Sequence, residues 1–111
     1  MEKVDRGENG TVEWPVLKSD GTPLDLSACT LIQAEYMQQK NVRETFVHGD
    51  DDEIRISEIE ENVLIIEYPI PLTERLDEGP VTLKITLEIP DDTMSDGVTR
   101  VEFDSVVFEI K

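Results

Sequence analysis

Apolar and polar residues alternate along most of this chain, which is the pattern of β-strands that bury one face. The longest example is 81–89, where five apolar residues occupy the odd positions and polar residues occupy the even ones. Shorter segments with the same period, bounded by turn residues, predict further strands over 11–16, 30–38, 42–48, 54–56, 63–68 and 98–110. About seven short strands with little helix between them predict an antiparallel all-β sandwich.

Three of the predicted strands carry a feature that constrains their place in the sheets. Pro15 cannot donate a ladder hydrogen bond, which predicts that the first strand lies at a sheet edge or carries a bulge. The run Val63–Tyr68 is almost continuously apolar, which predicts burial on both faces, either inside the sandwich or against another subunit. In the last strand the apolar residues change parity after Phe103, so we expect a β-bulge near Asp104-Ser105.

The connections between the strands contain one turn signal and one helical signal. Asp20-Gly21 supplies residues that tolerate positive φ and predicts a turn over 18–23. Leu72–Leu76 predicts a single helical turn with Thr73 as its N-cap. A length of 111 residues suits one domain and is too short for two ordinary ones. We therefore expect residues 1–111 to form a single domain, with residues 1–9 as a flexible arm.

Composition changes this picture mainly through charge. Hydrophobic residues make up 38% of the chain and charged residues 32%, and the net charge is −16. Disordered chains share such a composition, but they lack the period-two pattern of this sequence. The ten basic residues form no block, which argues against a nucleic-acid partner and against an anionic membrane surface. The acidity suits a basic partner or divalent cations.

The single cysteine and the first residues indicate the compartment in which the protein is made. Cys29 has no partner for an intrachain disulfide, and its mostly apolar neighbours predict a small buried thiol. Synthesis in a reducing compartment is therefore favoured. The segment Met1–Arg6 lacks an apolar signal region, and no apolar run is long enough to cross a bilayer.

This sequence contains few residues suited to catalysis. His48 is the only histidine and lies beside an acidic turn, where a surface side chain is the expected role. Cys29 carries no sequence signature of a nucleophile, and nucleophilic catalysis needs a nucleophile, a base and an orienting group. We therefore predict that the protein is not an enzyme and has no catalytic residues, no cofactor and no small-molecule substrate.

Two acidic loops are candidates for calcium. The segment 91–97 superficially resembles a calcium loop, but the glycine required at its sixth place is Asp96. The run Asp50, Asp51 and Asp52 offers oxygen ligands to a hard cation, although consecutive acidic residues more often point into water. The sequence therefore leaves two readings of this run, a calcium site and a solvated turn.

Two segments together carry a resemblance to a known family. Asp20–Ser27 reads DGTPLDLS between two predicted strands, and Leu72-Thr73 precedes Gly79 and the alternating strand 81–89. This arrangement resembles the immunoglobulin-like N-terminal domain of tailed-phage baseplate upper proteins and related small domains of tail and head-fibre proteins. The resemblance extends over Thr11–Ile110. It implies that the sandwich has an immunoglobulin-like fold.

The resemblance also implies a role. A protein of this kind is a non-enzymatic structural component of the virion, in the baseplate, tail, neck or head fibre. It is made in the host cytoplasm, docks other virion proteins and assembles into homo-oligomers. Leu31 and Met37, on the polar face of their strand, indicate either a surface covered by a partner or filling of the sandwich's second face. The alternative function is a cellular immunoglobulin-like binding or adhesion module assisted by calcium.

Overall fold

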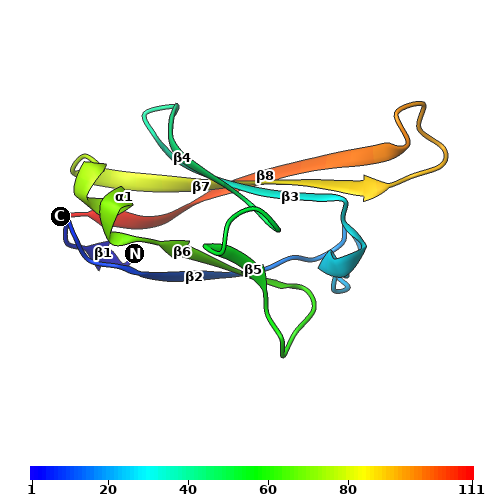
Figure 1. The fold of residues 1–111 in the computed structure, drawn as a ribbon, viewed down its shortest axis with the longest axis horizontal. Coiled ribbons are helices and arrows are strands. Elements are labelled where there is room, and N and C mark those ends of the chain that lie inside the picture. The colour runs from blue at the N-terminus through cyan, green and yellow to red at the C-terminus, as the bar shows by residue number, and fades with distance from the viewer.

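The computed structural model covers residues 1–111 and consists of two β-sheets packed face to face (Figure 1). Its one α-helix and one 3-10 turn both lie in connections between strands. The elements in chain order are β1 (Lys3–Val4), β2 (Gly10–Pro15), η1 (Leu26–Ala28), β3 (Leu31–Gln38), β4 (Asn41–Val47), β5 (Ile54–Ile56), β6 (Val63–Tyr68), α1 (Ile70–Arg75), β7 (Gly79–Pro90) and β8 (Val98–Ile110).

The larger sheet has the strand order β1-β8-β7-β3-β4 and the smaller one the order β2-β6-β5. All neighbouring strands are antiparallel except β1 and β8, which run parallel. Strands β2 to β8 follow the order B, C, C′, D, E, F and G of immunoglobulin domains, with B-E-D in one sheet and C′-C-F-G in the other. The predicted all-β sandwich is therefore confirmed.

The core lies between the two sheets and is filled by the alternating apolar residues. Strand β7 shows the pattern best, because its odd residues from 81 to 87 are fully buried while Thr82, Lys84 and Glu88 are half-buried. Four aromatic rings pack at one end of this layer, where Phe108 contacts both Tyr36 and Tyr68. The buried apolar residues are Val4, Val16, Leu26, Ile32, Ala34, Tyr36, Phe46, Ile54, Leu64, Ile66, Tyr68, Leu72, Leu76, Val81, Leu83, Ile85, Leu87, Phe108 and Ile110.

The seven predicted strands correspond to β2 to β8, and each predicted end falls within two residues of the observed one. Strand β2 lies at an edge of the smaller sheet, as Pro15 predicted. A bulge is present in β8, but it lies further along the strand than predicted. Val106 pairs with Thr82 and Phe108 pairs with Val81, so the extra residue is Val107.

Within the sandwich Val63–Tyr68 is buried on one face only, so the alternative of burial on both faces inside the sandwich was wrong, whereas burial of the other face against another subunit stays a prediction. In β6 only Leu64, Ile66 and Tyr68 are fully buried, whereas Val63 and Ile65 are half-exposed on the outer face of the smaller sheet. No third layer covers that face, because the only helix lies at the end of β6 and not across it (Figure 1).

Residues 1–9 do not form the predicted arm. Strand β1 pairs with the end of β8, and Val4 is completely buried in the core. The Gly7 N–H donates a hydrogen bond to the Thr73 hydroxyl (3.1 Å), and that hydroxyl donates to the Glu8 carbonyl (2.9 Å). These contacts attach the N-terminal segment to α1.

The same contacts correct the predicted helix cap. Helix α1 begins two residues earlier than expected, and its N-cap is Pro69, which makes no side-chain capping bond. Thr73 lies inside the helix and is completely buried. Pro71 fits the first turn because the N–H that proline lacks has no helical partner there. No helix in the structure has the length and apolar character that a membrane-spanning segment requires.

Candidate functional site

The segment that carries the family resemblance forms two consecutive turns at one end of the sandwich. Asp20 accepts hydrogen bonds from the backbone N–H (3.0 Å) and the hydroxyl (2.6 Å) of Thr22. Asp25 accepts the same pair of bonds from Ser27, at 3.0 and 2.6 Å, and so caps η1. Leu26 is thereby held in the core, where it is completely buried. The motif therefore shapes and anchors a connection between the two sheets.

Asp91 uses the same arrangement at the tip of the β7–β8 hairpin. Its two carboxylate oxygens accept hydrogen bonds from the hydroxyls of Thr93 and Thr99, both at 2.6 Å. These bonds stabilise the charged form and lower the pKa of Asp91, with the Thr93 hydroxyl as the largest cause. The pKa values of Asp20 and Asp25 are lowered in the same way by the hydroxyl two residues further on. All three aspartates act as turn-closing acceptors.

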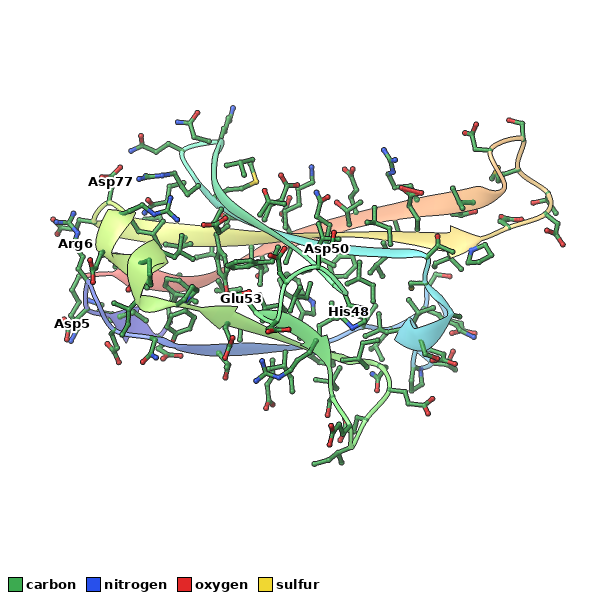
Figure 2. The ribbon with its side chains drawn as sticks, in the orientation of Figure 1. Asp5, Arg6, His48, Asp50, Glu53 and Asp77 are labelled. Atoms are coloured by element: carbon green, nitrogen blue, oxygen red, sulfur yellow. The ribbon has the colours of Figure 1, made fainter.

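The acidic run proposed for calcium lies in the connection between β4 and β5, where Figure 2 labels Asp50 and Glu53. Asp51 accepts a hydrogen bond from the Val47 N–H (2.8 Å) and so closes the turn, whereas Asp50 and Asp52 are exposed. No group of three or more acidic, histidine or cysteine side chains is placed to hold a metal ion. Calcium binding by Asp50, Asp51 and Asp52 stays a prediction without a preformed cluster of ligands.

The other two residues considered for chemistry lie in different settings. His48 is exposed at the end of β4 (Figure 2), and its backbone N–H donates to the Ile32 carbonyl (2.9 Å). Cys29 is half-buried after η1 and packs against the edge of the core. Burial and, to a smaller extent, the charge of Asp25 raise the pKa of the thiol. A raised pKa disfavours the nucleophilic thiolate.

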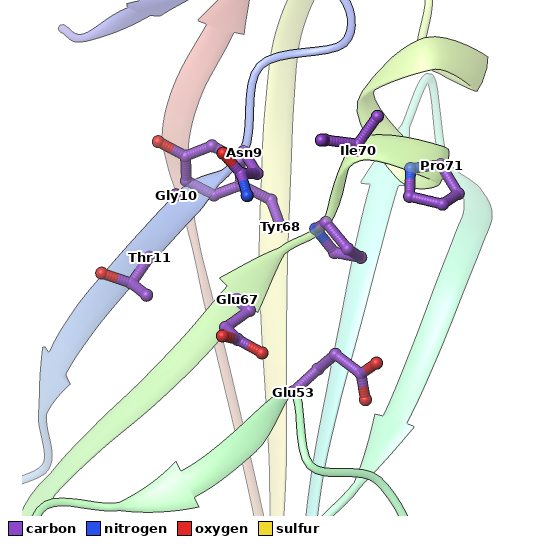
Figure 3. Close-up of a pocket in the computed structure, with 9 residues that line it drawn as sticks. Asn9, Gly10, Thr11, Glu53, Glu67, Tyr68, Ile70 and Pro71 are labelled. Atoms are coloured by element: carbon purple, nitrogen blue, oxygen red, sulfur yellow. The ribbon is translucent and has the colours of Figure 1, made fainter.

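A hollow of about 410 Å³ lies where β2, β6 and the start of α1 meet (Figure 3). Tyr68 forms part of its wall, and its hydroxyl donates to the Glu2 carboxylate (3.4 Å). Burial and the negative charge of Glu2 raise the pKa of Tyr68. Gly10 lies so close to the hydroxyl end of this tyrosine that a Cβ atom there would overlap it. The glycine is therefore required by the packing of Tyr68.

We expect Gly10→Ala to lower the free energy of unfolding by about 1–3 kcal/mol, because the added methyl forces the buried Tyr68 ring to move. Chemical denaturation measures the effect, and Thr11→Ala, at the exposed next position of β2, is the matched control. Equal stability of Gly10→Ala and the wild-type chain would mean that the ring and the β2 backbone are not in contact.

The most unusual surface feature is a group of exposed and half-exposed apolar residues on the outside of the smaller sheet and in the loop beside it, which we call the outer patch. It consists of Val63 and Ile65 on β6, Pro15 opposite Val63 on β2, and Ile59 in the β5–β6 loop. Ile59 is 92% exposed, the largest exposure of any large apolar residue in the chain. Two hollows, of about 150 and 370 Å³, flank its side chain.

The loop that carries Ile59 is an ordered turn and projects away from the sandwich (Figure 1, bottom). The Ser57 hydroxyl oxygen accepts hydrogen bonds from the backbone N–H groups of Ile59 (3.2 Å) and Glu60 (3.3 Å). Backbone bonds between Ser57 and Val63 (2.9 Å) and between Val63 and Glu60 (3.1 Å) close the loop. The isoleucine is thus presented to solvent on a defined backbone.

Acidic side chains flank Ile59 in the outer patch. Glu58, Glu60 and Glu61 are exposed next to Ile59, and none of them takes part in the six ion pairs of the structure. Two of these ion pairs, Arg75 with Glu44 (2.7 Å) and Arg43 with Asp77 (3.1 Å), instead attach α1 and the residues that follow it to the β3–β4 hairpin. The sequence did not reveal this site, because Ile59 is an isolated apolar residue in a turn.

Comparisons with protein-family models, with curated proteins and with solved structures found no match for this chain. Its function therefore has to be inferred from its own residues. The outer patch is the surface feature that the packing of the domain does not explain, because its apolar side chains contribute nothing to the layer between the sheets.

Proposed function

We propose that this protein is a non-enzymatic structural component of a tailed-phage particle that docks another virion protein through the outer patch. The single observation that supports docking most strongly is the 92% exposure of Ile59 on a hydrogen-bonded turn. An exposed apolar side chain of this size gains free energy only when a partner removes it from water. Apolar patches rimmed by polar residues commonly mark protein–protein contacts.

The partner of the outer patch is expected to be a protein with an apolar pocket surrounded by lysine or arginine. Ile59 would fill such a pocket, while Val63 and Ile65 would cover its margin. The three glutamates beside Ile59 would face the basic rim. Complementary charge at the rim mainly accelerates association and selects the partner, whereas the buried apolar anchor supplies most of the affinity.

The virion assignment is supported by the DGTPLDLS turn followed by the Leu72-Thr73 corner, Gly79 and the alternating strand, which resemble small domains of phage tail and head-fibre proteins. The strand order of the sandwich fits the immunoglobulin-like fold of those domains. On this proposal the protein is made in the host cytoplasm, enters the particle as a homo-oligomer and has no small-molecule substrate.

We expect Ile59→Asp to abolish incorporation of the chain into particles while leaving the isolated domain folded. The side chain makes almost no contact within the domain, so its replacement should change the free energy of unfolding by no more than about 0.5 kcal/mol. At the docked interface, burial of an unpaired carboxylate should weaken binding by roughly 30-fold or more, as loss of an interface anchor does. Quantitative mass spectrometry of particles purified from a phage that carries the variant gene measures incorporation.

Met94→Asp is the matched control, because Met94 is 50% exposed on the distant tip of the β7–β8 hairpin. This variant introduces the same charge and should enter particles normally. Normal incorporation of Ile59→Asp, or equal loss with Met94→Asp, would exclude the outer patch as the docking surface.

A further inference from the structure

Most of β8 forms an open edge of the larger sheet. Strand β8 pairs with β7 along its whole length, but β1 covers its other side only at Glu109 and Ile110. The stretch 98–106 therefore has no neighbour on that side, and a strand edge of this kind presents unpaired backbone N–H and C=O groups. Figure 1 shows the far end of this hairpin extending past the smaller sheet, and Arg100, Val101 and Glu102 in this part of β8 are exposed.

We propose that a second copy of this chain pairs with this edge, antiparallel, so that two β8 strands join two sandwiches through one continuous sheet. The pair would be related by a two-fold axis beside Val101. This interface would form in the purified chain, because it does not depend on the virion partner proposed above.

Charge selects this register among those that two-fold symmetry allows. In a symmetric antiparallel pair, residue i faces residue j and j faces i, and facing residues share one face of the sheet. A centre at Val101 places Arg100 opposite Glu102 of the second copy, and this contact occurs twice. A centre at Glu102 would place Arg100 opposite Asp104 but would set two glutamates against each other at the axis, and a centre at Phe103 would set Glu102 against Asp104 twice. Directly opposed like charges are destabilising.

The Val101 register also extends ion pairs that exist within each chain. Arg100 contacts Glu88 on β7 (3.0 Å), and Glu102 contacts Lys84 on β7 (3.5 Å). The Arg100 and Glu102 side chains are still 62% and 49% exposed, so each can accept a further partner. Joined at Val101, these residues form a row of alternating charges that runs across both β7 and both β8 strands.

The opposite face of the same stretch is apolar. Val101 lies opposite the fully buried Leu87 yet is 38% exposed, because the smaller sheet does not reach it. In the proposed pair it would contact Val101 of the second copy, and Thr99 would lie opposite Phe103. Phe103 is half-buried and packs at one side on Trp14, with ring centroids 5.3 Å apart. Pairing would therefore cover both half-exposed apolar side chains.

Disulfide cross-linking tests the register directly, in a Cys29→Ser background. Val101→Cys places the two thiols opposite each other across the axis, so oxidation should produce a covalent dimer in high yield. Ser105→Cys is the matched control on the same face and strand. Its two copies would lie about 27 Å apart along the strands, given about 3.4 Å per residue, which is far beyond disulfide reach.

Charge reversal provides the second test, with sedimentation of the purified protein as the readout. Arg100→Glu and Glu102→Arg should each weaken dimerisation by roughly tenfold or more, because each sets like charges opposite each other twice. The double variant Arg100→Glu/Glu102→Arg restores opposite charges across the axis and should recover most of the lost affinity. Thermal unfolding of the three variants separates lost dimerisation from lost folding.

Three results would overturn the proposal. The first is a wild-type chain that sediments as a monomer at all concentrations. The second is equal cross-linking of the Ser105→Cys and Val101→Cys chains. The third is a double variant whose dimerisation is weakened by as much as the effects of the two single variants combined. A monomer whose β8 amides become protected from hydrogen exchange only when a different protein is added would assign the edge to that protein instead.

Discussion

Replacing Phe108 with alanine should lower the free energy of unfolding by about 3–5 kcal/mol, the largest effect that we expect from a single substitution. Phe108 is 1% exposed and its ring contacts Tyr68 (4.7 Å between centroids) and Tyr36 (6.1 Å). Tyr68 belongs to the smaller sheet and Tyr36 to the larger one, so removal of the ring leaves a cavity between the sheets. Denaturant titration followed by far-ultraviolet circular dichroism measures the change.

Val106→Ala is the control for Phe108→Ala, because Val106 lies on the same strand but is 43% exposed on the outer face. It should cost no more than about 0.5–1 kcal/mol. A similar loss of unfolding free energy in the two variants would mean that the Phe108 ring is not buried between the sheets. The placement of the bulge at Val107 would then be wrong.

The second large effect is expected at Leu83 in the middle of β7. Leu83 is completely buried and lies opposite Tyr36 on β3, so Leu83→Ala should lower the free energy of unfolding by about 2–5 kcal/mol. The adjacent Thr82 points to the other face, where Thr82→Ala should cost less than about 1 kcal/mol. The same denaturant titrations compare the two variants at neighbouring positions.

Equal losses for Leu83→Ala and Thr82→Ala would mean that β7 is buried on both sides. The larger sheet would then have a covering layer on its outer face, and the two-layer architecture would be incorrect. Leu31 and Met37 are half-exposed on that outer face, where only another molecule could cover them.

The sequence predicted the fold well because period-two alternation reports which side of a strand meets the core. The ends of β6 and β8 were predicted to the residue, because turn residues or a proline bound their apolar segments. Features that depend on contacts distant in the chain were not predicted. Strand β1 has only two residues and becomes a strand by pairing with β8, more than 100 residues away in sequence.

Local rules also failed where a tertiary contact overrides them. Thr73 fits an N-cap by residue type, but its hydroxyl bonds to the backbone of Gly7 and Glu8 and belongs inside the helix. The run Val63–Tyr68 satisfies the pattern of a strand buried on both faces, yet within the domain only one face is covered. The apolar outer residues of that run are instead part of the outer patch.

The candidate site was harder to predict than the fold. The consecutive carboxylates of Asp50, Asp51 and Asp52 predict a calcium site, but one of them closes a turn and the others are exposed. Ile59 carries no signal of its own, because one isoleucine among glutamates resembles an ordinary turn. Its importance becomes visible only when the structure places it beside Val63 and Ile65 on an uncovered sheet face.

The most direct test of the proposed function is quantitative mass spectrometry of purified particles from a phage whose genome encodes this chain. We predict that peptides from both β2 and β8 are recovered, in a fixed ratio to the major structural proteins and in a copy number that a symmetric assembly allows. Purified particles that contain no copy of the chain, alongside abundant free protein in the lysate, would contradict a structural role in the virion.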